Sequence, residues 1–238
     1  MKILLLSDIH GNFPALKAIM NSFAGTPFAA ICNCGDSIVY APFPNETLHW
    51  LQSHNVHSIL GNTDRKVKRL LRGKNFKEPR KQEKRIMYSQ TAEQMDAKAR
   101  NYLFSLKKSF FFSAGDHSIC LFHGSPEHPN EFLFPDTPTE RFTELAATCS
   151  CSIIITGHSH TPYHKLIGTT HFINPGSVGR MFDSNPAASC AVLSIRNKSV
   201  NVKHYRIDWP IEQTLQALQQ YNLPKIYQTM YLTGRKLN

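Results

Sequence analysis

The sequence lacks a long apolar run. No stretch of its 238 residues approaches the roughly 20 apolar residues that span a bilayer. The amino-terminal run Ile3–Leu6 is interrupted by Asp8, far short of the apolar segment of a signal peptide. We therefore expect a cytoplasmic protein with no membrane association.

Cysteine pairs of the Cys-x-x-Cys type are also missing, although the chain contains six cysteines. Disulfide frameworks are typical of small secreted domains, and this chain is neither small nor evidently secreted. Most of the cysteines lie within or beside apolar runs, where a reduced thiol packs as a small hydrophobic group. We therefore predict buried, reduced thiols for Cys32, Cys34, Cys120, Cys149, Cys151 and Cys190.

Acidic residues are scarce in one segment. Between Arg65 and Arg85 eleven lysines and arginines face only Glu78 and Glu83, which gives the segment a charge of +9 of the total +10. Such a basic segment can steer a polyanion, including nucleic acid, toward a neighbouring site. It can equally be a solvated helix and loop.

No linker, low-complexity tract or internal repeat divides the chain, so residues 1–238 are predicted to form one domain. Helical spacing of apolar residues follows Pro14, and Thr91 with Gln94 indicates a capping box for a helix through Phe104. Further helices are expected at 46–54, in the basic segment to Leu71, at 139–148 and after Pro210. The later strands are expected at 110–113, 118–122, 152–156, 163–167, 170–173, 188–195 and 200–207. Alternating βα units followed by many strands favour an α/β layered sandwich.

Five apolar runs each end in residues that can bind a metal ion. Runs without alternation are typical of strands buried on both faces, and the ligands of α/β sheets gather beyond the carboxyl ends of the strands. Asp, His and Asn provide the oxygen and nitrogen donors that suit Mn²⁺, Fe or Zn²⁺. The sequence therefore predicts a metal-centred active site. The runs and their following residues are Met1–Leu6 with Asp8 and His10, Ala29–Cys34 with Asp36, Val56–Leu60 with Asn62 and Asp64, Ile119–Phe122 with His123, and Ile153–Thr156 with His158 and His160.

The order Asp-x-His, Gly-Asp, Gly-Asn-x-Asp, His and Gly-His-x-His resembles the calcineurin-like metallophosphoesterases. Within that superfamily the chain is most similar to the compact prokaryotic phosphoesterases, some of which cleave diadenosine polyphosphates. The segments Gly35–Tyr40 and Asn174–Gly179 resemble motifs of this branch. The resemblance covers Met1 to about Ile207. It implies a four-layer αββα sandwich of two mixed β-sheets with two metal ions.

The resemblance also implies a set of site residues. One metal would be held by Asp8, His10 and His160, and the other by Asn62, His123 and His158, with Asp36 bridging both. A hydroxide between the two metals would attack the phosphorus atom and displace the leaving group. We expect Mn or Fe, with Zn or Ni as alternatives. The expected catalytic residues are Asp36, Asn62 and Asp64, and the expected substrate-binding residues are Asn12, Asn62 and Arg180.

The chain departs from the pattern at one position. Many family members have His after Gly-Asn, where it is thought to protonate the leaving group with the help of the next acidic residue. Here Thr63 occupies that position, and a hydroxyl is no general acid near neutral pH. A phosphate leaving group needs little protonation, which favours phosphoanhydrides such as dinucleoside polyphosphates over alkyl monoesters.

Three functions remain open from the sequence. The first is a dinuclear phosphoesterase that acts on phosphodiester or phosphoanhydride bonds of small nucleotides. The second is a nuclease or nucleic-acid end-processing enzyme, favoured by the segment Arg65–Arg85, although only Phe76 in it could stack on bases. The third is a non-catalytic interaction scaffold of the same fold, which would have lost metal ligands. The sequence does not fix the oligomeric state.

Overall fold

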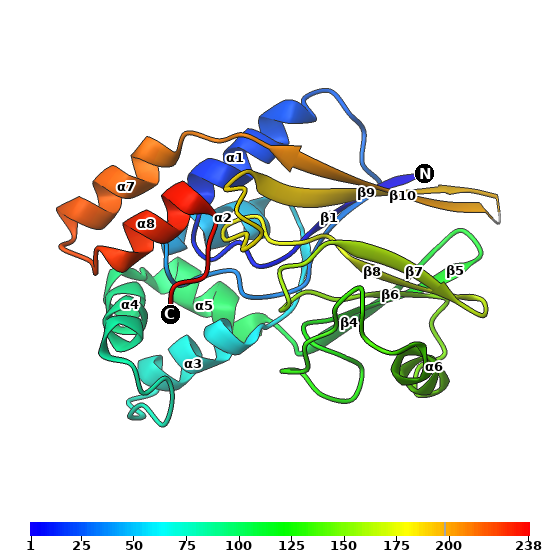
Figure 1. Cartoon of the computed structure of the whole chain (residues 1–238), viewed down its shortest axis with the longest axis horizontal. Coiled ribbons are helices and arrows are strands. Elements are labelled where there is room, and N and C mark those ends of the chain that lie inside the picture. The colour runs from blue at the N-terminus through cyan, green and yellow to red at the C-terminus, as the bar shows by residue number, and fades with distance from the viewer. Residues whose placement is uncertain (198) are drawn as a thin grey trace.

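The structure is a computed structural model that describes residues 1–197 and 199–238. Two five-stranded sheets pack face to face, in the orders β10-β9-β1-β2-β3 and β4-β5-β6-β8-β7. In Figure 1 most helices cover one side of the first sheet, and α6 alone lies beside the second. This arrangement of helix, sheet, sheet and helix layers confirms the predicted αββα sandwich.

Both sheets are mixed, as predicted. In the first, β1 runs parallel to β2 and antiparallel to β9, and β2 runs parallel to β3. In the second, β5, β6 and β8 are parallel neighbours, with antiparallel β4 and β7 at the edges. The strands are β1 Lys2–Leu6, β2 Ala30–Asn33, β3 His57–Ser58, β4 Ser109–Ala114, β5 His117–Phe122, β6 Ile153–Ile155, β7 Tyr163–Ile167, β8 Thr170–Asn174, β9 Ala188–Arg196 and β10 Ser199–Ile207.

The helices follow the sequence signals in most places. In α1, Asn12 caps the helix by accepting a hydrogen bond from the Ala15 N–H, and Leu16 and Ile19 are buried toward the first sheet. The helices are α1 Phe13–Ser22, α2 Pro44–Ser53, α3 Asn62–Leu71, α4 Gln82–Gln94, α5 Ala97–Ser105, α6 Thr139–Ala147, α7 Ile211–Gln220 and α8 Ile226–Thr233. None of these is long and apolar enough to span a bilayer, within the residues that the structure describes.

Two local expectations were wrong. The helix predicted from Thr91 through Phe104 is two helices, because Asp96 caps a new helix by accepting from the Ala99 N–H, and Thr91 instead donates to the Met87 carbonyl inside α4. The strand expected over Val56–Leu60 is reduced to His57–Ser58, which pairs with β2, and Ile59 forms an isolated bridge with Lys107 before the chain enters α3. Helix α8 was not predicted.

The cysteines differ from the prediction at one place. Cys120 of β5 forms a disulfide with Cys151, which precedes β6, and the Cys149 Sγ lies 3.1 Å from the Cys120 Sγ. Because β5 and β6 are neighbouring strands, these sulfurs meet although 31 residues separate them in sequence. Cys149 is a free thiol but only half-buried, whereas Cys32, Cys34 and Cys190 are buried free thiols, as expected.

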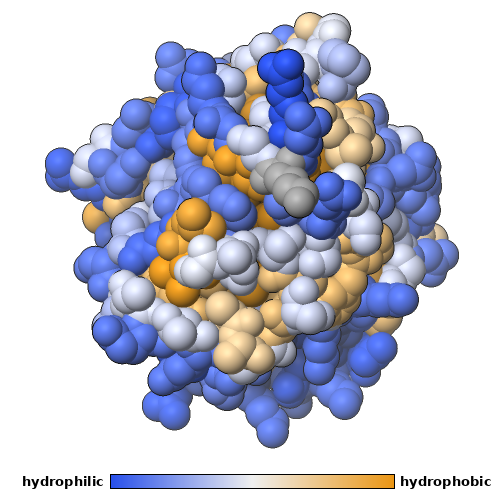
Figure 2. Space-filling view, turned by 90° about the vertical axis from the view of Figure 1, so that its right-hand side faces the viewer, coloured by the Kyte–Doolittle hydropathy of each residue, from blue (hydrophilic) through white to orange (hydrophobic). Residues whose placement is uncertain are grey.

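An apolar layer between the two sheets holds the strands, and therefore their ends, in place. Leu5 of β1, Ile119 of β5 and Ile153 of β6 are fully buried there. Figure 2 shows the right-hand end of the molecule as drawn in Figure 1, where apolar side chains are bordered by hydrophilic ones. Because these side chains pack between the two sheets, they fix the distance between the sheets and determine which face of each strand is turned inward.

Replacing Leu5 by Ala tests this support. Because Leu5 is fully buried between the sheets, we expect Leu5→Ala to lower the free energy of unfolding by about 3 kcal/mol, which lowers the melting temperature by roughly 6–12 °C. The matched control Leu166→Ala removes an exposed leucine of β7 and should leave the melting temperature within about 2 °C. Equal effects of the two substitutions in thermal denaturation would contradict this account of the core.

Candidate metal centre

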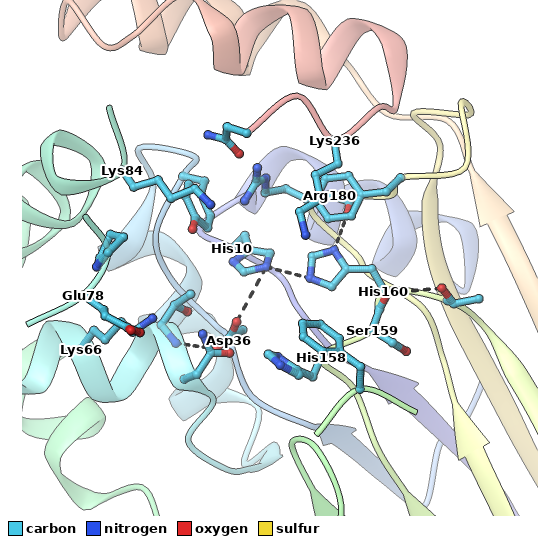
Figure 3. Close-up of a pocket in the computed structure, with 18 of the residues that line it drawn as sticks. His10, Asp36, Lys66, Glu78, Lys84, His158, Ser159, His160, Arg180 and Lys236 are labelled. Carbon is cyan, nitrogen blue, oxygen red and sulfur yellow. Dashed lines mark hydrogen bonds and ion pairs between the residues drawn. The ribbon is translucent and has the colours of Figure 1, made fainter. Parts of the chain in front are cut away.

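The polar residues that follow the strands meet at one end of the sandwich. Asp8 and His10 follow β1, and Asp36 follows β2. His123 follows β5 of the second sheet, and His158 and His160 follow β6. Asn62 opens α3 directly after β3. Seven residues from five segments thus line or border one cleft (Figure 3).

The backbone at these positions is unusual. Five of the seven residues are in the left-handed region, where side chains other than glycine are rare: Asp8, His10, Asp36, His158 and His160, with φ between 51° and 64°. Cross-strand hydrogen bonds hold them there, including Asp8 N–H to Gly35 O and His10 N–H to Asp36 O, both at 2.9 Å. Such strain costs of order 1–3 kcal/mol a residue and clusters at functional sites.

Three side chains form a first group. The His160 Nε2 lies 3.3 Å from the Asp8 Oδ1, and the His10 Nε2 lies 4.0 Å from the same oxygen. The two imidazole Nε2 atoms are 3.2 Å apart. All three side chains are buried. Three donors that converge in this way can hold one metal ion.

Asp36, His123 and His158 form a second group, beside the first. The His123 Nε2 lies 3.4 Å from the Asp36 Oδ1 and 2.9 Å from the Asn62 Oδ1, so the amide oxygen joins this group. The other carboxylate oxygen of Asp36, Oδ2, lies 3.9 Å from the His10 Nε2 of the first group. Asp36 therefore faces both groups, one oxygen to each.

Backbone carbonyls orient two of the imidazoles. The His123 Nδ1–H donates to the Cys34 carbonyl at 2.8 Å, and the His160 Nδ1–H donates to the Arg180 carbonyl. A carbonyl can only accept, so Nδ1 carries a proton and Nε2 is the ring nitrogen directed into the centre. This arrangement is typical of histidines that bind metals.

The donors fit a metal ion by two further criteria. The Asp8 Oδ1 is buried and has no hydrogen-bond partner among the residues described, whereas the Ser7 hydroxyl donates to its Oδ2. Burial lowers the pKa of His10 to about 3 and that of His158 to about 4, which keeps both imidazoles neutral. Although burial raises the pKa of Asp8, the charge of His160 lowers it to about 2. Ionised carboxylates and neutral imidazoles are the forms that bind metals.

The electrostatics around Asp36 show the same preference for a cation. Burial raises the pKa of Asp36, but the neighbouring His123 lowers it well below its usual range. Conversely, burial lowers the pKa of His123 and the charge of Asp36 raises it to about 9. The buried carboxylate thus attracts a positive charge to this position, which a bound metal ion would supply in place of the proton.

Two glycines let the loops approach each other. A Cβ at Gly61 would collide with the Oδ1 and the amide nitrogen of Asp36. A Cβ at Gly157 would collide with the Ser7 hydroxyl and lie 2.8 Å from the Asp8 Oδ2. Neither glycine has a positive φ, so both are required by space and not by conformation.

Two of the expected site residues have other contacts. Asp64 is fully buried, and its carboxylate accepts hydrogen bonds from the N–H groups of Gly61, Ser37 and Ile38. Burial raises its pKa to about 7. Asn12 accepts from the Thr214 hydroxyl and the Ala15 N–H and donates to the Gly179 carbonyl. Neither side chain lines the cleft. Their hydrogen bonds instead stabilise the loops that carry the candidate ligands.

Arg180 does line the cleft, as a substrate-binding residue should. The cleft has a volume of about 600 Å³. Sequence reasoning did not assign several of its residues to the site, because they are not among the candidate metal ligands that end the apolar runs. Phe132 stacks on the His158 ring with 4.1 Å between centroids, and Phe182 stacks on His160 at 4.8 Å. The other missed residues are Tyr40, Lys66, Glu78, Lys84, Tyr88, Phe134 and Lys236.

The glycine at position 61 allows a direct test of this geometry. Because an added methyl would displace the Asp36 carboxylate, we expect Gly61→Ala to weaken Mn²⁺ binding at least about tenfold in titration calorimetry. Gly25 serves as the control, since a Cβ there meets nothing within 4 Å. Gly25→Ala should bind Mn²⁺ like the parent protein despite a backbone strain of about 1 kcal/mol. Unchanged Mn²⁺ affinity in Gly61→Ala would contradict the position assigned to Asp36.

The chain is similar to known proteins over its whole length. It is 26% identical over 250 residues to an uncharacterized protein of Methanocaldococcus jannaschii, with 98% of each chain covered. A metallophosphoesterase from Sphaerobacter thermophilus superposes with a TM-score of 0.81 at 24% identity, covering 98% of this chain and 99% of that one. A hypothetical protein from Pyrococcus horikoshii superposes with a TM-score of 0.87 at 20% identity, covering 99% of each.

The family follows from the sequence itself. Residues 1–198 match the calcineurin-like phosphoesterase superfamily domain, which is most of the chain and includes all seven candidate metal ligands. The resemblance predicted from the ordered motifs is thereby confirmed. The chain belongs to the calcineurin-like phosphoesterase superfamily and is a phosphoesterase, a hydrolase of phosphate esters.

Proposed function

We propose that the protein is a dinuclear metal-dependent enzyme that hydrolyses phosphodiester or phosphoanhydride bonds of small nucleotides, such as dinucleoside polyphosphates. The observation that carries this proposal is the position of Asp36. One of its oxygens lies 3.4 Å from His123 and the other 3.9 Å from His10. A carboxylate between two groups of donors is what two neighbouring metal ions require.

The two groups of converging side chains support the ligand set that the resemblance implied. Asp8, His10 and His160 would hold one ion, Asn62, His123 and His158 the other, and Asp36 would join them. When bound, the two ions would polarise the phosphoryl oxygens and activate a water molecule near neutral pH. Mn or Fe is the proposed occupant, and a mixed set of His, Asp and Asn also accepts Zn or Ni.

The charge of the ligand set suits an anionic substrate. Two carboxylates against two divalent ions leave the centre positive, because imidazole and amide donors are neutral. Arg180 adds a further cation on the wall of the cleft. A planar guanidinium binds two phosphate oxygens at once and so orients the group for in-line attack.

Thr63 bears on the choice of leaving group. It lines the cleft, and its hydroxyl donates to the Ile38 carbonyl while its N–H donates to the Asp36 Oδ1. The side chain therefore stabilises the loop through this hydrogen bond, and it has no proton that titrates near neutral pH. Without an acid at this position, bonds to good leaving groups such as phosphates or aryl alcohols should be preferred.

A nuclease or end-processing activity has one observation in its favour. A second cavity of about 360 Å³ adjoins the cleft and shares Lys66 and Glu78 with it. Its remaining lining, which includes Arg69, Phe76 and Lys77, comes from the basic segment Arg65–Arg85. A strand with several phosphates could continue from the cleft along this wall. The non-catalytic scaffold is not favoured, since no expected metal ligand has been replaced.

The bridging carboxylate should be indispensable. We expect Mn²⁺-dependent hydrolysis of bis-p-nitrophenyl phosphate, lost on chelation and reduced at least about 10³-fold in kcat by Asp36→Asn. Asp116→Asn, an exposed change in the turn between β4 and β5, is the control and should retain full activity. Turnover that survives both chelation and Asp36→Asn would rule out the proposed centre.

Because Thr63 cannot act as a general acid, the rate of hydrolysis should depend strongly on the pKa of the leaving group. We expect kcat/KM to fall at least about 10²-fold from p-nitrophenyl phosphate to glycerol phosphate, because an alkoxide must be protonated. Thr63→His should narrow this gap by accelerating the alkyl ester selectively. Thr63→Gln, similar in size but without a titratable proton, should not. If Thr63→His changed both rates equally, the leaving-group argument would fail.

A further inference from the structure

Arg180 is a buried cation without an acidic partner. Its side chain is 8% exposed, and its guanidinium carbon lies 3.7 Å from the centroid of the Tyr40 ring. Its nitrogens donate only a weak hydrogen bond, to the Met230 sulfur at 3.7 Å, and form no ion pair with the residues described. The aromatic face recovers only part of the cost of burying this charge. The guanidinium therefore retains donors for an anion in the cleft.

Two lysines lie on the same wall of the cleft. Figure 3 shows Lys84 and Lys236 beside Arg180, on one side of the His10 and His160 pair. Neither lysine forms an ion pair within the part of the chain that the structure covers. Burial lowers the pKa of Lys84, and the charges of Arg180 and Lys236 lower it further. Three cations that repel each other across a cavity are stabilised by an anion between them.

The segment that carries Lys236 is held in place. Gly234 ends α8 with a φ of 62°, and its carbonyl accepts from the Ser184 N–H at 2.9 Å. The Arg235 Nε donates to the Ser184 hydroxyl at 3.1 Å, and the Asn238 amide donates to the Tyr227 hydroxyl at 3.0 Å. These bonds fix the chain on both sides of Lys236, so the lysine is a built part of the cleft wall.

We propose that Lys84, Arg180 and Lys236 bind a second phosphate of the substrate, one that does not react, and so select substrates with phosphates linked in series. The proposal rests on the proposed function, since the reacting phosphate is the one at the metal centre. Three cations in one cleft of about 600 Å³ suit the dense charge of a phosphoanhydride chain. In a nucleic acid the phosphates are farther apart, so the cations that bind them follow a longer groove.

Two substrates with the same leaving group test the proposal. Bis-p-nitrophenyl phosphate offers one phosphate, and the γ-p-nitrophenyl ester of ATP offers three in series. In Lys84→Gln and in Lys236→Gln, the KM for the ATP ester should rise about tenfold more than the KM for bis-p-nitrophenyl phosphate. Lys225→Gln removes an exposed lysine of the same region outside the cleft, and should leave the ratio of the two KM values within about twofold.

The outcomes separate this proposal from the proposed function. Hydrolysis of both esters with equal KM changes would overturn the second phosphate site and leave the phosphoesterase intact. A larger KM change for a single-stranded oligonucleotide than for the ATP ester would assign the three cations to nucleic acid instead. If the parent protein hydrolysed neither ester, calorimetric titration of the chelator-treated full chain with tripolyphosphate would decide. An affinity lowered about tenfold in both lysine variants supports the site, and an unchanged affinity overturns it.

Discussion

The position of the two buried carboxylates is the constraint on which the site depends. Asp8 and Asp36 follow neighbouring parallel strands of one sheet, while the imidazoles that face them come largely from the other. Contacts across the two sheets fix this relation. The His158 N–H donates to the Asp8 Oδ2 at 3.0 Å, and the His123 Nδ1–H donates to the Cys34 carbonyl. The two sheets must therefore be packed in their correct relative position before the donor side chains can come together.

Most of this arrangement could be predicted from the sequence, because strand ends are marked locally. A buried apolar run followed by Asp-x-His or Gly-His-x-His identifies both the end of a strand and the donors that follow it. The sequence marks Asp8, His123 and His160 as candidate donors without any knowledge of strand pairing. It does not show which of the polar residues also have a second, local role. Asn12 and Asp64 follow the motifs as substrate and catalytic residues would, but their polar atoms bind backbone N–H groups of the site loops.

What the sequence did not reveal depends on contacts between distant segments. The Cys120–Cys151 disulfide follows from the neighbouring positions of β5 and β6, which composition alone does not show. Phe132, Phe182 and Lys236 lie in segments without a motif, and only the packing of loops and α8 brings them to the cleft. The other side chains that line the cleft are thus harder to predict than the candidate donors at its base, because no strand end marks their positions in the sequence.

The candidate donors at the base of the cleft and several residues of its wall also come from different parts of the chain. The metal donors lie within residues 1–198, which match the superfamily domain, whereas Tyr227, Met230 and Lys236 lie beyond them. Arg180 connects the two: its carbonyl orients His160, while its guanidinium lies against Tyr40 and contacts Met230 of α8. Under the proposed second phosphate site, residues beyond 198 would influence the choice of substrate without replacing any candidate metal donor. Arg180 would then be the residue through which a change in the cleft wall could still affect the candidate metal centre.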